Sequence, residues 1–158
     1  MGKRHQAREL ALKTLFQLEA ADDDTEEVLR YHADEGAATP DVATFALQLV
    51  RGVIANREKL DAILSEASEH WKLGQMAKVD RIILRIAVYE IAIDRQVPTK
   101  AAINESIELA KTFSGEEAGR FVNGILVRSR PPPHLEPGYA GRHSPPRGAP
   151  FQPREDDR

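Results

Sequence analysis

The chain has 158 residues, of which 41% are hydrophobic and 30% charged, and its net charge is −3, as in one globular domain with a tail. It has no cysteine, which excludes disulfides, thiolate zinc sites and cysteine nucleophiles. No apolar run approaches the roughly 18 residues that cross a membrane, and the basic start lacks the apolar stretch of a signal peptide. We therefore expect a soluble, cytoplasmic protein with no membrane partner.

Charge is distributed unevenly along the chain. Residues 1–13 carry four basic side chains and one acidic one, whereas residues 21–36 carry seven acidic side chains and one basic one. The basic residues fall in the first turns of a predicted helix, where the helix dipole disfavours each cation by about 0.3–1 kcal/mol. A local positive potential of this kind attracts an anionic partner even when the whole chain is negative.

Apolar residues recur at helical spacing throughout residues 1–130, and no stretch of useful length alternates with the period of a strand. Asp24 or Thr25 can cap the second helix, and Thr39-Pro40 begins the third. These features predict an all-α bundle of about seven helices. The predicted helices cover the apolar residues from Ala7 to Leu18, Val28 to His32, Phe45 to Ile54, Leu60 to Ala67, Val79 to Ile93, Ile103 to Phe113 and Ala118 to Leu126.

Two further signals concern the end of the bundle. Ser114-Gly115-Glu116-Glu117 matches a capping box, which predicts that the Ser114 hydroxyl accepts the Glu117 amide and begins the last helix. Residues 131–158 contain eight prolines and three glycines and cannot sustain regular structure. The chain therefore divides into a helical domain, 1–130, and a disordered tail, 131–158.

Enzymatic chemistry is not visible in the sequence. The five histidines share no ligand spacing, no glycine-rich loop follows a strand, and no serine lies in a nucleophile elbow. We expect neither a metal nor a cofactor, and we interpret the chain as a binding protein.

Several polar residues interrupt the apolar faces of the predicted helices. Asn104 and Asn123 fall among apolar neighbours, and a structural interpretation is that they satisfy buried backbone groups where helices meet. Gly124 would then permit close packing. The charged residues Asp80, Arg81 and Arg85 would lie on the rim of the central helix.

Three stretches carry a resemblance to a known family: "RHQARELALKTLFQLE", "VDRIILRIAVYEI" and "VPTKAAINESIELAKTFSGEEAGRFVNGIL". In this order and spacing they resemble the NusB family, from about residue 3 to residue 128. The resemblance implies two packed three-helix subdomains with an extra helix. It also implies binding of the single-stranded boxA element of rRNA leader transcripts together with NusE, a small-subunit ribosomal protein. The complex would join other Nus factors on the elongating RNA polymerase, suppress termination and support rRNA synthesis.

The resemblance also suggests roles for individual residues. The family's arginine-rich motif falls on the start of the chain, where His5 and Gln6 replace arginines of some relatives, so RNA binding is expected to need the partner. Phe16 either stacks on RNA or lies in the core. The implied RNA-binding residues are Lys3, Arg4, His5, Gln6, Arg8, Phe16, Glu117 and Arg120. Asp80, with Arg81 and Arg85, would face NusE, and Asn104, Glu105, Asn123 and Gly124 would be structural.

Charge reversal of Arg4 and Arg8 is expected to weaken boxA binding and leave the helical melt unchanged. Two alternatives remain at this point. A similar bundle forms the front domain of some RNA cytosine methyltransferases, but their catalytic cysteine has no counterpart in this chain. The other alternative is a homodimer that covers its own basic patch and binds RNA only weakly and nonspecifically.

Overall fold

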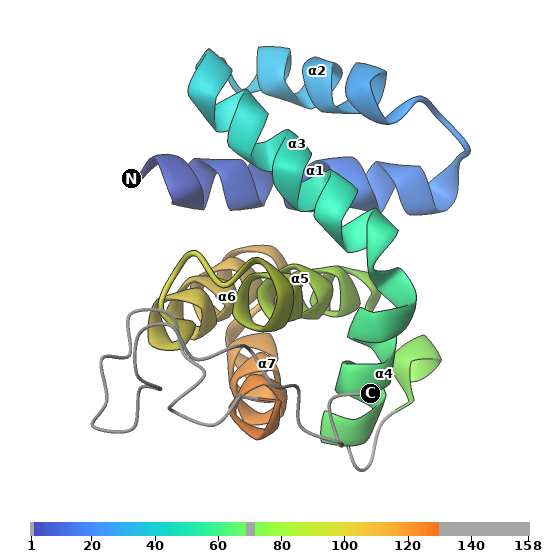
Figure 1. Ribbon diagram of the computed structural model, residues 1–158, viewed down its shortest axis with the longest axis vertical. Helices are drawn as coiled ribbons and strands as arrows, with labels where there is room; N and C mark the ends of the chain where they lie inside the picture. The colour runs from blue at the N-terminus through green and yellow to red at the C-terminus, as the bar shows by residue number, and fades with distance from the viewer. Residues whose placement is uncertain (1, 69–71, 130–158) are drawn as a thin grey trace, which may run out of the picture.

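The computed structural model describes residues 2–68 and 72–129, and within them every regular element is a helix (Figure 1). The predicted tail, 131–158, lies outside the described residues. None of the described helices is both long and apolar enough to cross a bilayer. The α-helices are α1 Lys3–Ala20, α2 Thr25–Glu35, α3 Pro40–Ala55, α4 Arg57–Ala67, α5 Lys78–Val88, α6 Thr99–Ser114 and α7 Glu116–Arg128. A short 3₁₀ turn, η1 Leu73–Gln75, precedes α5, and a π-helical segment, η2 Tyr89–Asp94, follows it.

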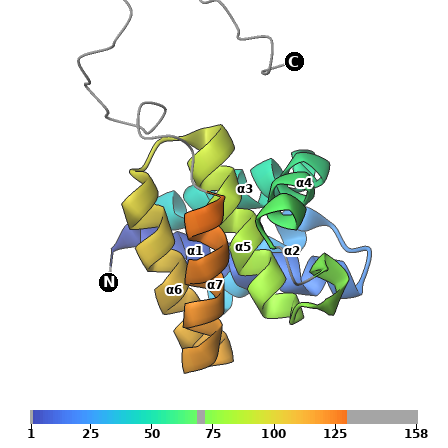
Figure 2. The same cartoon turned by 90° about the horizontal axis from the view of Figure 1, so that it is seen from below.

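The helices form two groups of three. Helices α1, α2 and α3 pack on one another in the upper part of Figure 1, and α5, α6 and α7 do so below them. Helix α4 descends from the end of α3 and packs against α5 and α7, and the view from below shows α6 and α7 side by side (Figure 2). The all-α prediction and the two three-helix groups with an extra helix are confirmed.

Helix α5 is the centre of the molecule, because it contacts α1, α3, α4, α6 and α7. Its residues from Ile82 to Val88 are all buried, and Ile83 and Leu84 have no exposed surface. Burying one such aliphatic side chain contributes roughly 1.5–3 kcal/mol relative to leaving it in water. The mostly aliphatic core thus joins both groups through α5, as its apolar sequence predicts.

Of three helix boundaries predicted from the sequence, two are confirmed and one is wrong. Asp24 accepts a hydrogen bond from the Glu27 amide at 3.0 Å, and Pro40 occupies the first turn of α3, both as predicted. The prediction of a capping box at Ser114 is wrong. Helix α6 continues through Ser114, and Gly115 at φ 111° turns the chain into α7 with no side-chain cap. Because Ser114 is still helical, its hydroxyl is not in the extended geometry that an N-cap requires.

The π-helical segment η2 brings α5 close to α3. A Cβ atom added at Gly52 of α3 would lie 2.2 Å from the Tyr89 ring, so any larger residue there requires the ring to move. The segment ends at Arg95, a non-glycine residue with φ 57°. Segments of this kind are rare and often occur at functional sites. Here η2 places Glu90 in the interior, facing α1.

Candidate nucleic-acid interface

The start of α1 presents positive charge and open backbone donors together. Its N-cap is Gly2, which offers no side-chain cap, and the first turn contains no acidic residue. The first N–H groups of a helix have no partner within the helix, and the dipole adds partial positive charge there. Lys3 and Gln6 are exposed and Arg4 is half-buried in this turn. The arrangement is suited to an anion such as a phosphate.

Helix α3 holds two of these side chains. Lys3 Nζ lies 2.5 Å from Asp41 Oδ2, an exposed ion pair. Hydrogen bonds from Lys3 and then from Thr39 lower the pKa of Asp41 to about 2. The Arg4 guanidinium lies over the Phe45 ring, with Cζ 4.6 Å from the ring centroid. Lys3 therefore has a carboxylate partner, whereas Arg4 contacts an aromatic face and keeps its charge uncompensated among the described residues.

His5 is turned toward two carboxylates rather than toward solvent. Its Nδ1 lies 2.7 Å from Glu105 Oε2 and its Nε2 lies 3.3 Å from Glu9 Oε1. The Glu105 contact ties α6 to α1. Glu105 thus has a definite contact between helices, and His5 is engaged with carboxylates on both sides.

Arg8 has a different role from the one that the sequence suggests. It is only 4% exposed, and its Nε and Nη2 each donate to a Glu90 oxygen at 2.7 Å. Burial lowers the pKa of Arg8, but the Glu90 carboxylate outweighs it and the pKa lies above its usual value. A guanidinium so enclosed cannot meet a phosphate, so we leave Arg8 out of the RNA-contacting residues that we propose.

Phe16 lies on the surface and not in the core. It is 42% exposed, with the Lys78 ammonium 4.3 Å from its ring centroid. It borders a groove of about 470 Å³ between α1, α2, α5 and α6. We call this the apolar groove; its lining residues are Leu12, Lys13, Phe16, Gln17, Ala20, His32, Val79 and Phe113. Phe113, which is 39% exposed, gives the groove a second aromatic ring.

The three charged residues of α5 do not share one environment. Asp80 is buried in the first turn of α5, and its Oδ1 has no hydrogen-bond partner among the described residues. Arg81 donates to the Leu73 carbonyl at 3.1 Å and to Glu19 at 3.3 Å. Arg85 is buried and donates to both Glu19 and Asp61. One oxygen of Asp80 is thus unsatisfied, while both arginines take part in contacts within the protein.

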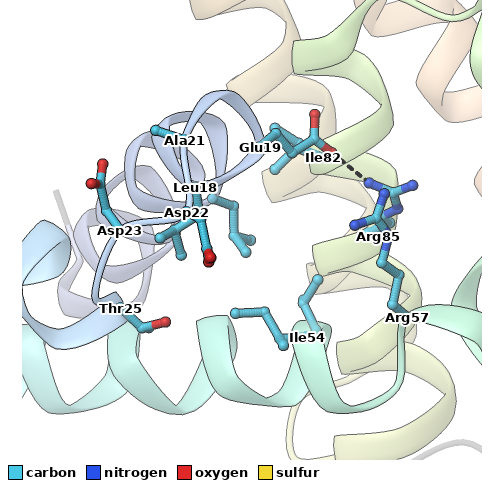
Figure 3. A pocket seen from close by; sticks show the side chains of 12 residues that line it. Leu18, Glu19, Ala21, Asp22, Asp23, Thr25, Ile54, Arg57, Ile82 and Arg85 are labelled. Atoms are coloured by element: carbon cyan, nitrogen blue, oxygen red, sulfur yellow. Dashed lines mark hydrogen bonds and ion pairs between the residues drawn. The ribbon is translucent and has the colours of Figure 1, made fainter.

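The Glu19–Arg85 pair closes one side of a pocket of about 270 Å³ (Figure 3). The close-up shows Asp22 and Asp23 on the loop after α1, across the pocket from Arg57. Arg85 therefore joins α1, α4 and α5 at this pocket and is not free to reach a partner.

The remaining predicted residues lie on α6 and α7. Glu117 and Arg120 are exposed in the first turns of α7, and neither has an ion-pair partner among the described residues. Asn104 and Asn123 are exposed too, so they do not satisfy buried backbone groups. Gly124 is not at a close approach, because an added Cβ would be 4.0 Å from the nearest side chain, that of Arg128. The structural interpretation of these three residues is not supported.

The NusB family model matches residues 5–130. A transcription antitermination protein NusB of Bacillus pumilus is 43% identical over 124 residues, which are 78% of this chain and 92% of that protein. One from Myxococcus xanthus is 40% identical over 132 residues, covering 81% and 94% of the two chains.

This chain belongs to the NusB family of transcription antitermination proteins. A solved structure of T. maritima NusB covers 82% of this chain and 90% of its own, with a TM-score of 0.73 and 35% identity. NusB in a crystal structure with NusE and double-stranded RNA aligns with a TM-score of 0.74 at 24% identity, covering 82% and 96% of the two chains, a likeness of fold.

Several residues of this NusB-family site are missing from the sequence-based prediction. Asp41, Phe45 and Glu90 each contact a residue of the arginine-rich motif, from α3 or from η2. The sequence signal for them is weak, because each partner is far away along the chain and no local spacing links the two. Only the position of Glu90 on the most apolar helical stretch hints that its carboxylate needs a buried cation.

Proposed function

We propose that this protein binds the single-stranded boxA element of rRNA leader transcripts together with NusE. With other Nus factors it would join the elongating RNA polymerase, suppress termination and support rRNA synthesis. Membership of the NusB family supports the proposal, as does the crystal structure in which a protein of the same fold, NusB, is bound to NusE and double-stranded RNA. The observation that carries it for this chain is the start of α1. Uncapped N–H groups and the uncompensated Arg4 meet there, and the turn has no acidic residue.

The proposed phosphate-contacting residues are Lys3, Arg4 and Arg120, with Gln6 and Glu117 nearby in sequence as polar contacts for bases. Neutralised phosphates release counterions. The logarithm of the affinity for single-stranded RNA therefore falls with the logarithm of the salt concentration, with a slope of about 0.7 per neutralised phosphate. Lys3 must exchange Asp41 for a phosphate, whereas Arg4 has no ion pair to give up. Arg4 is therefore the cation that we expect to contribute most.

The proposed NusE-facing surface is the apolar groove, with the first turn of α5, which holds the buried Asp80, at its edge. Val79 lines the groove directly before Asp80 in the sequence, and Lys78 covers Phe16, so the first turn of α5 forms one edge of the groove. An exposed groove with two aromatic rings is typical of a protein–protein contact. On this basis we assign Phe16 to the protein partner rather than to RNA.

The test is a titration of boxA RNA, with and without NusE, at two salt concentrations. Arg4→Gln should weaken binding and reduce the salt slope by about 0.7. Arg30→Gln, which removes an exposed arginine from α2, is the matched control and should change neither. An Arg4 variant that binds like the wild type would contradict the RNA site, and no gain from NusE would contradict the joint complex. Light scattering of the free protein then tests the alternative of a homodimer with weak, nonspecific RNA binding.

A further inference from the structure

The Arg4–Phe45 contact joins the first turn of α1 to α3. Phe45 is half-buried on the core side and presents its ring to the guanidinium. Lys3, His5 and Arg8 each have a carboxylate partner, and among the described residues Arg4 has none. The Phe45 ring attracts the guanidinium that lies over it, and a guanidinium plane is a surface on which bases stack.

A small hollow lies beside this stacked pair. Arg4, Phe45 and Gln48 line it from α1 and α3, and Tyr89, Asp94 and Gln96 line it from η2 and the turn after it. Gln48 and Gln96 are exposed, and within the described part of the chain their amides make no hydrogen bond. A side-chain amide carries a carbonyl acceptor and an NH₂ donor, which match the donors and acceptors on the edge of a base.

The combination of groups is more specific than a phosphate site needs. A phosphate would require the cation alone, whereas an aromatic face, a flat guanidinium and two unpaired amides match a planar, polar-edged ring. The hollow holds only about 20 Å³, so the ring would lie across its mouth and not inside it. An unpaired base can be splayed out in this way, whereas a base within a duplex cannot.

We propose that Arg4, Phe45, Gln48 and Gln96 form a subsite for one unpaired RNA base. The base stacks on the Arg4–Phe45 pair, and its edge meets the two glutamine amides. This inference rests on the proposed RNA-binding function and adds to it a recognition site on α3 and on the turn after η2. It assigns sequence preference to residues outside the arginine-rich motif.

The experiment uses single-stranded boxA RNA in which 2-aminopurine replaces one base at a time. Stacking quenches its fluorescence, so wild-type protein should quench at one position in particular. Phe45→Leu keeps an apolar side chain at this position and leaves the charge of Arg4 in place. It should abolish that quench and weaken RNA binding by about fivefold or more, with an unchanged salt slope. Tyr31→Leu, which removes an exposed ring from α2, is the matched control and should leave the quench intact.

A second variant guards against a loss of packing at Phe45. Gln48→Ala with Gln96→Ala alters two exposed side chains, so the fold should be unaffected, and the affinity should become less sensitive to base identity at the quenched position. If Phe45→Leu and the glutamine variant both bind and quench like the wild type, while Arg4→Gln still lowers the salt slope, the subsite is refuted and RNA binding stands. If the wild type does not bind the RNA, the proposed function fails and the subsite with it.

Discussion

Arg4 and Arg8 lie one helical turn apart on α1 and meet opposite environments. Arg4 rests on Phe45 without a carboxylate, whereas Arg8 is enclosed with Glu90 in a bidentate pair. A buried ion pair adds little net stability, but removing one partner leaves an uncompensated charge in the interior. One basic motif therefore contains an arginine without a carboxylate partner among the described residues, which we propose contacts RNA, and a structural one.

Arg8→Met should destabilise the protein by about 3–5 kcal/mol, because Glu90 would remain buried and unpaired. Arg4→Gln should change the free energy of unfolding by no more than about 0.5 kcal/mol. Urea unfolding followed by circular dichroism measures both. The double variant Arg8→Met, Glu90→Met should recover much of the loss, since no charge then remains in the interior. Equal stability of Arg8→Met and wild type would contradict the buried pair. Because Arg8 is buried against Glu90, charge reversal at Arg8 should also destabilise the fold, contrary to the expectation from the sequence.

We expect His32 to make stability depend on pH below about 6.5. Its Nε2 lies 2.8 Å from Gln17 Oε1, and burial, followed by the nearby Lys13, lowers its pKa, while Glu35 opposes the shift. Because the folded state binds this proton more weakly, its contribution is complete above the unfolded pKa of about 6.5. It is lost as the pH falls through the lowered folded value.

The urea concentration at the unfolding midpoint of the wild type should therefore decrease as the pH is lowered from 7.5 to 5. His32→Asn should show a smaller fall over the same range, since it removes the titrating group and keeps a polar side chain. Parallel midpoint curves for the two proteins would show that His32 does not contribute.

At the scale of the helices, the sequence was informative where structure depends on near neighbours. Apolar spacing predicted the seven α-helices of residues 2–68 and 72–129, and Asp24 and Pro40 marked two of their starts. The π-helical segment was not predicted, because it continues the apolar pattern of α5 without a break. Contacts between helices were missed for a similar reason: Arg8 and Glu90 are 82 residues apart, and nothing in the spacing pairs them.

The glycines also show that contacts between distant segments cannot be predicted from local sequence. Gly124 drew attention by interrupting an apolar face, yet it has space around it, while Gly52 is the glycine that packing requires. Its close approach to Tyr89 depends on η2, which the sequence does not reveal.

Gly52→Ala should destabilise the protein by about 1–3 kcal/mol, because its Cβ would overlap the Tyr89 ring and force α3 and η2 apart. Gly124→Ala is the matched control in another helix interior. There the methyl group meets no close neighbour, and the higher helix propensity of alanine should add about 0.5–1 kcal/mol. Thermal unfolding separates the two outcomes. A stabilising Gly52→Ala would show that Tyr89 moves aside freely.

At the scale of the whole molecule, α1 serves both proposed partners. Arg4 lies in its first turn, and the residues that border the apolar groove begin at Leu12 and continue to its end. Arg4 and Phe16 are about 18 Å apart along the helix axis at 1.5 Å per residue. RNA and a protein partner can therefore occupy α1 at the same time. Binding of two partners that contact each other raises the affinity of each without new chemistry.

Phe113→Ser tests this arrangement through the groove. Because Phe113 is already 39% exposed, the substitution should leave the fold and the RNA affinity of the protein alone unchanged. It should weaken NusE binding about tenfold, as loss of an aromatic contact at an interface does. The gain in RNA affinity that NusE provides should then shrink at a fixed NusE concentration. Tyr31→Ser, which removes a more exposed aromatic ring outside the groove, is the matched control and should preserve that gain.

Fluorescence anisotropy of labelled boxA RNA, titrated with each variant in the presence and absence of NusE, measures the effect. Linkage requires that RNA strengthens NusE binding by the same factor by which NusE strengthens RNA binding, so the reverse titration checks the result independently. If Phe113→Ser retains the full NusE-dependent gain and Arg4→Gln alone reduces it, the partner does not use the groove. Light scattering of Phe113→Ser against wild type then tests whether a second copy of the chain docks on the exposed rings of Phe16 and Phe113 instead.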